Sequence, residues 1–193
     1  MSGAEGRLRR FADLLVRWNA RLNLVAPRDV PVLWERHIED SLQLVPLMPK
    51  GVERAIDLGS GGGFPGLVLA IATGVRFELI EADQRKAAFL RTAVLETGAP
   101  AVVHACRIEA ADVPPAPLVT ARALAPLPRL LPLAAPLLAP GGVCLLLKGA
   151  RVEEELAAAE ADWRMDVERW PSRTPARIAA DGVVLRIAGV ERR

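Results

Sequence analysis

The spacing of hydrophobic and polar positions changes along the chain and predicts which segments form helices and which form strands. In the N-terminal segment 6–21, apolar residues recur every three or four positions, which predicts an amphipathic helix. These apolar residues are Leu8, Phe11, Leu14, Leu15 and Trp18. A second helix is expected over 31–44, with Asp29 as its N-cap. The chain is therefore predicted to begin with a helical appendage, residues 1–50.

From residue 54 onward, short apolar runs alternate with helical patterns. Strands are expected at 54–58, 76–81, 101–105, 117–121, 142–148, 164–169 and 183–187. Helices are expected at 65–73, 84–97, 126–138 and 150–161, the third of them kinked or broken by Pro132 and Pro136. This alternation predicts an α/β domain over 51–193, built on a doubly wound, mostly parallel sheet. Because no helix separates the last two strands, they should pair antiparallel at one edge.

A glycine-rich segment at 57–66, Asp-Leu-Gly-Ser-Gly-Gly-Gly-Phe-Pro-Gly, joins the first of these strands to a helix. Its glycines allow a positive φ and let a ligand approach the backbone without a Cβ in the way. The free amides at the start of the following helix add a favourable dipole. The segment therefore predicts a binding site for a nucleotide-type cofactor.

Two cofactor motifs overlap in this segment. Gly61, Gly63 and Gly66 satisfy the G-x-G-x-x-G fingerprint of dinucleotide-binding proteins, which keeps a small NAD-dependent reductase as an alternative. Asp57 and Gly59, taken with the glycines at 61 and 63, satisfy acid-x-G-x-G-x-G, the first motif of class I methyltransferases that use S-adenosylmethionine.

Three observations favour the methyl donor. A carboxylate at Asp57 would repel the pyrophosphate of a dinucleotide but not a cationic sulfonium or amino group. The 193-residue chain is too short for a dinucleotide domain with a separate substrate domain, and an antiparallel last strand pair is usual in methyltransferases. Glu81, at the end of the second strand, supplies the acid for ribose hydroxyls in either interpretation.

Composition narrows the class of protein. With 51% hydrophobic and 25% charged residues the chain is globular, and its net charge of +2 only permits a polyanionic partner. Cys106 and Cys144 lie in apolar runs and are expected to be reduced core residues of a cytoplasmic protein. Two histidines offer almost no material for a zinc site, so no metal is expected. The uncharged run 130–147 contains three prolines, which favours a buried helix, turn and strand over a membrane span.

Several short motifs occur in a fixed order through most of the chain. They are Trp18-Asn19, Asn23-Leu24, Arg36 to Leu42, Gly63 to Gly66, Lys86 to Leu90, Arg107 to Glu109, Arg122-Ala123 and Leu147 to Gly149. Together they resemble one family, the small-ribosomal-subunit RNA methyltransferase G (GidB) proteins. The chain departs from the family pattern at Pro117-Leu118, where Phe-Asp is usual, and at Ala121, where Ser is usual.

The resemblance implies a Rossmann-like class I methyltransferase fold with S-adenosylmethionine as cofactor. It places Gly59 and Phe64 in the cofactor pocket, with Glu81 on the ribose and Arg122 also lining the pocket. Ile108 and Glu109 would lie near the adenine. The implied activity is methylation of guanine N7 at nucleotide 527 of 16S ribosomal RNA. A non-catalytic RNA-binding module with the same fold remains a second alternative, and no protein or membrane partner is implied.

Arg36, His37, Asp40 and Ser41 lie on one predicted helix, in pairs spaced four residues apart. Such spacing makes side-chain pairs along a helix surface and lacks the separate orienting and oxyanion groups that a His37-Asp40-Ser41 hydrolase triad would need. A surface hydrogen-bond network is the simpler interpretation. The family resemblance adds a third, in which this helix covers the cofactor cleft and contacts RNA.

Guanine N7 carries an in-plane lone pair and no proton, so no general base is expected. Arg122 and Lys148, which end two strands at the ligand-binding edge of the sheet, are candidate target-side contacts. The alternatives are a salt bridge for Arg122 and a snorkelling surface position for Lys148. Near the C-terminus, aromatic and basic residues interleave, which fits either an RNA surface or core tryptophans. These residues are Trp163, Arg164, Arg169, Trp170, Arg173 and Arg177.

Overall fold

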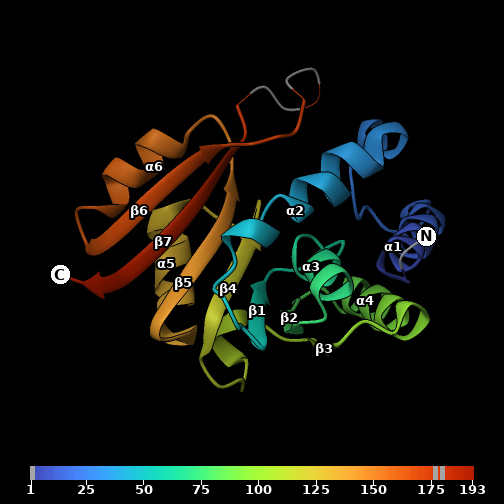
Figure 1. Ribbon diagram of the computed structural model, residues 1–193, viewed down its shortest axis with the longest axis horizontal. Coiled ribbons are helices and arrows are strands. Elements are labelled where there is room, and N and C mark those ends of the chain that lie inside the picture. The colour runs from blue at the N-terminus through green and yellow to red at the C-terminus, as the bar shows by residue number, and fades with distance from the viewer. Residues whose placement is uncertain (1–2, 176–177, 179–180) are drawn as a thin grey trace.

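A seven-stranded sheet in the order β3-β2-β1-β4-β5-β7-β6 forms the centre of the computed structural model (Figure 1). The structure describes the whole chain except residues 1–2, 176–177 and 179–180. The strands are β1 (Arg54–Leu58), β2 (Arg76–Ile80), β3 (Ala101–His104), β4 (Ala116–Arg122), β5 (Leu138–Lys148), β6 (Trp163–Pro171) and β7 (Val183–Arg192). The α-helices are α1 (Gly3–Asn19), α2 (Asp40–Leu42), α3 (Gly66–Thr73), α4 (Gln84–Thr97), α5 (Leu127–Ala134) and α6 (Val152–Ala159).

The pairing of the strands confirms the predicted doubly wound sheet. Strands β1 to β5 pair in parallel, and the order of the sheet reverses at β1, next to β4. Strand β7 lies between β5 and β6 and runs antiparallel to both. The antiparallel pair expected at one edge is therefore present, and the carboxyl ends of β1 and β4 lie side by side where ligands bind in such sheets.

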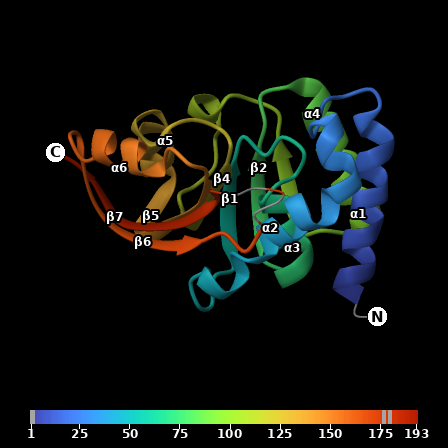
Figure 2. The same cartoon turned by 90° about the horizontal axis from the view of Figure 1, so that it is seen from above.

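Alternate residues of the strands supply two cores on opposite faces of the sheet. Ala55 packs in the core that α1, α3 and α4 cover, whereas the next residue, Ile56, packs in the core under α5 and α6. The apolar stripe of α1 predicted from the sequence is buried in the first core, against α3 and α4. Figure 2 shows α1 and α4 side by side at one end of the molecule and α5 and α6 together at the other.

The helix predicted over 31–44 is wrong in detail. The chain instead forms a 3₁₀ turn (Pro27–Val32), a π-helical turn (Trp34–Glu39) and the single α turn α2. Pro31 lies inside the 3₁₀ turn and cannot donate a backbone hydrogen bond there. Asp29 makes no cap and lies inside the 3₁₀ turn. A π-turn places an extra residue within one turn and is frequent at functional sites.

The apolar run 130–147 folds as predicted, into a buried helix, a turn and a buried strand. Helix α5 ends at Ala134, and a 3₁₀ turn that contains Pro136 (Ala135–Leu137) leads into β5, so the predicted break is confirmed. Strands β5 and β7 are longer than expected, beginning at Leu138 and ending at Arg192 respectively. Within the described residues, no helix has both the length and the apolar character needed to cross a membrane.

Candidate functional site: two adjoining cavities at the strand ends

The glycine segment forms the loop between β1 and α3 and is held by the acid predicted on β2. Gly59 adopts a φ of +63°, and a Cβ at this position would lie 2.6 Å from Leu124 Cδ1. The two carboxylate oxygens of Glu81 accept hydrogen bonds from the amides of Gly61 (2.8 Å) and Asp83 (2.7 Å). Glu81 therefore fixes the loop, and each of its oxygens retains a lone pair for a ligand hydroxyl.

Asp57 supports the loop from behind. Its side chain is fully buried, and Oδ1 accepts a hydrogen bond from Thr120 Oγ1 at 2.6 Å. A Cβ on Gly66 would lie 2.4 Å from Asp57 Cβ, so only glycine lets α3 begin this close to the carboxylate. Burial raises the pKa of Asp57 to about 6. Asp57 does not line the cavity that opens in front of the loop, and the structure places it in support of the loop instead.

A cavity of about 430 Å³ opens in front of this loop. Seven of the nine residues predicted for the cofactor line it, namely Gly59, Gly61, Phe64, Glu81, Ile108, Glu109 and Arg122. Gly63 does not line it, because this residue faces α1, where an added Cβ would lie 3.0 Å from Phe11. Lys86, Arg107 and Leu124 also line the cavity, although they were not predicted to. Their only signal in the sequence is that they lie in or beside family motifs.

A larger cavity of about 710 Å³ adjoins the first at the carboxyl ends of β4 and β5. The two cavities share a wall made of Arg122, Ala123 and Leu124. Ala123 has a φ of +52°, a left-handed conformation that costs about 1 kcal/mol for a residue with a Cβ. Strain of this kind persists where the surroundings enforce it, and functional sites are its usual location.

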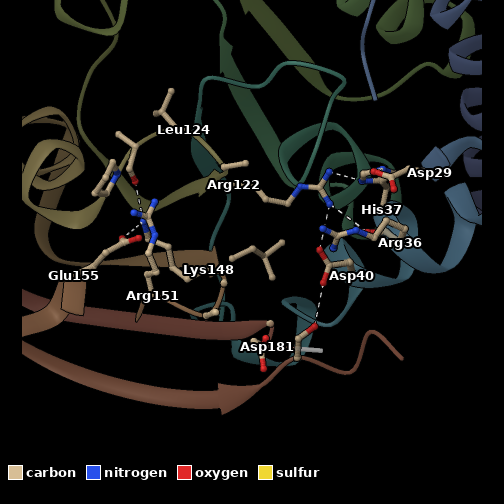
Figure 3. Close-up of a pocket in the computed structure, with 18 residues that line it drawn as sticks. Asp29, Arg36, His37, Asp40, Arg122, Leu124, Lys148, Arg151, Glu155 and Asp181 are labelled. Carbon is tan, nitrogen blue, oxygen red and sulfur yellow. Dashed lines mark hydrogen bonds and ion pairs between the residues drawn. The ribbon is translucent and has the colours of Figure 1, made fainter. Parts of the chain in front are cut away.

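Arg122 is the centre of a polar cluster on one side of the larger cavity (Figure 3). Its guanidinium donates to Asp40 Oδ2 at 3.2 Å, to the Arg36 carbonyl at 3.3 Å and to His37 Nδ1. It also lies 5.0 Å from the centre of the Phe64 ring, on which His37 stacks at 4.9 Å. The salt bridge weighed for Arg122 is present, and the residue lines both cavities as well.

His37 is neutral in this cluster. Its burial and the positive charges of Arg122 and Arg36 lower its pKa from 6.5 to about 3. Because Nδ1 accepts from Arg122, the ring proton is on Nε2, which faces Asp29 Oδ2 at 3.5 Å. The ring therefore adds no positive charge to the shared wall.

Asp40 links this cluster to the segment after β6. Its Oδ1 accepts hydrogen bonds from Thr174 Oγ1 (2.7 Å), Gln43 Nε2 (2.7 Å) and Ser172 Oγ (3.2 Å), while Oδ2 is left for Arg122. The carboxylate is buried, so these bonds hold α2 and the connection from β6 to β7 together at the cavity wall.

The structure excludes the hydrolase triad and shows what Ser41 and Lys148 contact. Ser41 Oγ donates to the His37 carbonyl at 2.7 Å and is fully buried, so it does not meet the imidazole and lines neither cavity. Lys148 does not snorkel to the surface, because its Nζ forms an ion pair with Glu155 Oε2 at 2.6 Å and donates to the Ala125 carbonyl at 2.8 Å. It lines the larger cavity from the side opposite Arg122 (Figure 3).

The C-terminal aromatic and basic residues divide between core and surface. Trp163 is buried under α5 and α6, and Trp170 packs partly against the other core, which favours the core interpretation for both. Arg169 pairs with Glu153 on the surface at 2.7 Å. Arg177 lies outside the described residues.

Comparison with known proteins identifies the family. Residues 4–175 match the model of the GidB family, described as rRNA small subunit methyltransferase G. The chain belongs to this family. It is 56% identical over 186 residues to the ribosomal RNA small subunit methyltransferase G of Gluconobacter oxydans, covering 96% of this chain and 94% of that protein. It is 57% identical to that of Acidiphilium cryptum, covering 96% and 85%.

Among solved structures, the fold of this GidB family member is similar to that of an O-methyltransferase from Bacillus cereus in complex with SAH. The TM-score is 0.60 at 15% identity, over 93% of this chain and 90% of that one. The N-methyltransferase NodS from Bradyrhizobium japonicum gives a TM-score of 0.59 at 15% identity, over 79% and 96%. These likenesses confirm the predicted class I methyltransferase fold.

The family motifs, which are scattered along the sequence, converge in space. The segments 36–42, 63–66, 122–123 and 147–149 each contribute lining residues to one or both cavities. The segments 36–42, 63–66 and 122–123 contact one another through the Arg122 cluster. The motifs of this GidB family member therefore describe one composite site made of two adjoining cavities.

Proposed function

We propose that the protein transfers a methyl group from S-adenosylmethionine to the N7 atom of a guanine in small-subunit ribosomal RNA, in the cytoplasm. The observation that carries this proposal is the pair of cavities that share the Arg122–Leu124 wall. One cavity has the glycine loop and the acid of a nucleoside site, and the other is open to a second reactant. The family membership and the names of the relatives support ribosomal RNA as that reactant.

The residues of the smaller cavity fit S-adenosylmethionine. Glu81 offers carboxylate lone pairs suited to ribose hydroxyls, and Ile108 and Glu109 offer an apolar contact and an acceptor suited to an adenine. Leu124 closes the loop side with an apolar surface beside Gly59. When bound, the cofactor supplies an electrophilic methyl group on a cationic sulfur.

The chain's own residues position the base and accommodate charge. The N7 lone pair attacks without losing a proton, so no residue has to act as a base, and catalysis depends on alignment. The purine becomes cationic as the N–C bond forms. A neutral His37, and an Arg122 whose charge is balanced by Asp40, avoid opposing this cation at the shared wall.

The test is transfer of labelled methyl groups from S-adenosylmethionine to small-subunit RNA or subunits that lack this modification. We expect label in 7-methylguanosine after digestion, at one nucleotide. Label on protein alone would refute the RNA assignment. RNA binding without transfer would favour a non-catalytic module, and binding of NADH in preference to S-adenosylhomocysteine would favour a reductase.

A further inference from the structure

The larger cavity contains an ion pair that the methyl-transfer mechanism does not use. Lys148, at the end of β5, and Glu155, on α6, lie across the cavity from the Arg122 cluster (Figure 3). Their head groups meet at 2.6 Å, and both side chains are more than four-fifths buried. The amide of Leu127 also donates to Glu155 Oε2 at 3.0 Å. The pair is therefore held rigidly by β5, α5 and α6.

These contacts use some of the hydrogen-bonding groups of the pair and leave others. Of the three protons on Lys148 Nζ, one is donated to Glu155 Oε2 and one to the Ala125 carbonyl, which leaves one donor. Glu155 Oε2 accepts both of its bonds, whereas Oε1 has no hydrogen-bond partner within the described part of the chain. The cavity is thus offered one N–H donor beside one carboxylate acceptor.

A donor beside an acceptor complements guanine and mismatches adenine. Guanine presents the O6 acceptor next to the N1–H donor, whereas adenine presents the N6 amino donor next to the N1 acceptor. On adenine, the remaining Lys148 N–H would oppose the N6 amino donor, and Glu155 Oε1 would oppose the lone pair of N1. Burying polar groups without hydrogen-bond partners in this way is costly in free energy.

We propose that Lys148 and Glu155 determine base specificity, with Lys148 donating to guanine O6 and Glu155 Oε1 accepting from N1–H. This inference rests on the proposed function and deepens it. In guanine, N7 lies on the side of O6 opposite N1. A base held at O6 and N1 by this pair therefore turns its N7 edge along the cavity, where the shared wall of Arg122 and Leu124 borders the cofactor cavity.

The pairing also makes the chemistry compatible with a cationic product. A free lysine ammonium at O6 would raise the free energy of the purine cation, because the two charges repel. Glu155 neutralises the ammonium and leaves its donor function. Recognition of O6 and stabilisation of the cation are then achieved by the same two side chains.

The first experiment varies the target base in the unmodified small-subunit substrate, using wild-type protein. Inosine retains O6 and N1–H and lacks only the 2-amino group, so we expect kcat/KM within about threefold of that for guanosine. Adenosine and 1-methylguanosine at the same nucleotide should each be at least about tenfold poorer. Rejection of inosine, or acceptance of 1-methylguanosine, would overturn the assignment of the O6 and N1–H contacts.

The second experiment compares Glu155→Gln with Glu154→Gln, a neighbouring exposed position on the same helix. Glutamine offers both a donor and an acceptor, so Glu155→Gln should lower kcat/KM on guanosine and raise the adenosine-to-guanosine ratio at least about tenfold. Affinity for S-adenosylhomocysteine should stay close to wild type in both variants. The Tm should fall in Glu155→Gln, because the buried Lys148 loses its counter-charge, whereas Glu154→Gln should retain the wild-type Tm and the wild-type ratio.

The outcomes separate the two proposals. A wild-type protein that transfers no methyl group to guanosine RNA refutes the proposed function, and the specificity inference falls with it. Wild-type transfer to guanosine, combined with a Glu155→Gln variant that loses activity equally on both bases, refutes only the inference. Such a uniform loss is what a purely structural role for the ion pair would produce.

Discussion

The buried imidazole of His37 should make the stability of the fold depend on pH in a way that one substitution removes. His37 is stacked on Phe64 and accepts a hydrogen bond from Arg122, and only 5% of the residue is exposed. We expect His37→Asn to keep an acceptor near the Nδ1 position while removing the titratable group. The informative quantity is therefore the change in the free energy of unfolding between two pH values. Any effect of the substitution that does not depend on pH cancels in this difference.

The magnitude follows from the two pKa values. The unfolded chain binds a proton on this imidazole as the pH falls through 6.5, whereas the folded protein does so only near 3. Protons therefore favour the unfolded state in this window, and stability that is complete above pH 6.5 is lost as the pH falls. Between pH 7 and pH 5 the loss amounts to about 2 kcal/mol.

Asp57 acts in the opposite direction over part of the same range. Its pKa is raised by burial to about 6, so the folded state binds the extra proton as the pH falls, and the protein gains about 1 kcal/mol between pH 7 and pH 5. The wild-type protein alone would show a small net change and reveal neither group. Because Asp57 is present in both proteins, subtracting one pH dependence from the other isolates His37.

The assay is urea unfolding of wild type and His37→Asn at pH 7 and pH 5, at constant ionic strength. We expect wild type to lose about 2 kcal/mol more than the variant over this interval. Equal losses in the two proteins would show that His37 titrates normally in the fold. That result would also undermine the argument that His37 adds no positive charge to the shared wall of the two cavities.

Three further substitutions test the supports of the site. Glu81→Gln, which weakens the bonds to two loop amides, should raise the Kd for S-adenosylhomocysteine about tenfold in calorimetry, and an unchanged Kd would remove Glu81 from the cofactor site. Asp40→Asn should lower the free energy of unfolding by about 3 kcal/mol, because it leaves the buried guanidinium of Arg122 without its counter-charge. A loss below about 1 kcal/mol would show that the Arg122–Asp40 pair does not stabilise the fold in this way. Gly66→Ala should cost about 1–3 kcal/mol, because its Cβ would overlap Asp57, whereas the control Gly6→Ala on the exposed side of α1 should not destabilise.

The fold and most of the residues that line the smaller cavity could be predicted from the sequence because local patterns determine them. Strand β1, the glycine loop and α3 are adjacent in the chain, so their spacing places the loop at the strand end. Glu81 was found by the same logic, since its strand pairs directly with β1. In each case, the sequence of one element and of its immediate neighbour is enough to predict where the residue lies.

Long-range packing decides what the sequence left open or predicted wrongly. The pattern at 31–44 is helical, but the chain forms a 3₁₀ turn that contains Pro31 and a π turn that contains His37, whose ring stacks on Phe64. In the linear pattern Lys148 is a charged residue at the end of a buried strand, for which a snorkelling surface position is one interpretation. Only the packing of α6 against the sheet brings Glu155 next to it. No spacing rule anticipates such a contact, because it depends on how α6 packs against the sheet.

One electrostatic rule explains how Arg122, Lys148 and His37 are arranged around the larger cavity. Methyl transfer to N7 converts a neutral base into a cation, so positive charge nearby opposes the reaction while hydrogen-bond donors remain necessary for recognition. Arg122 is balanced by Asp40, Lys148 is balanced by Glu155, and His37 is held neutral by burial beside Arg122.

If this rule governs the site, removing either carboxylate should slow the chemical step more than it weakens RNA binding, because the added positive charge would attract phosphate and repel the product cation. Single-turnover rates and RNA affinities of Asp40→Asn and Glu155→Gln, measured together, would show whether the two effects diverge in this direction; a parallel loss of both would contradict the rule.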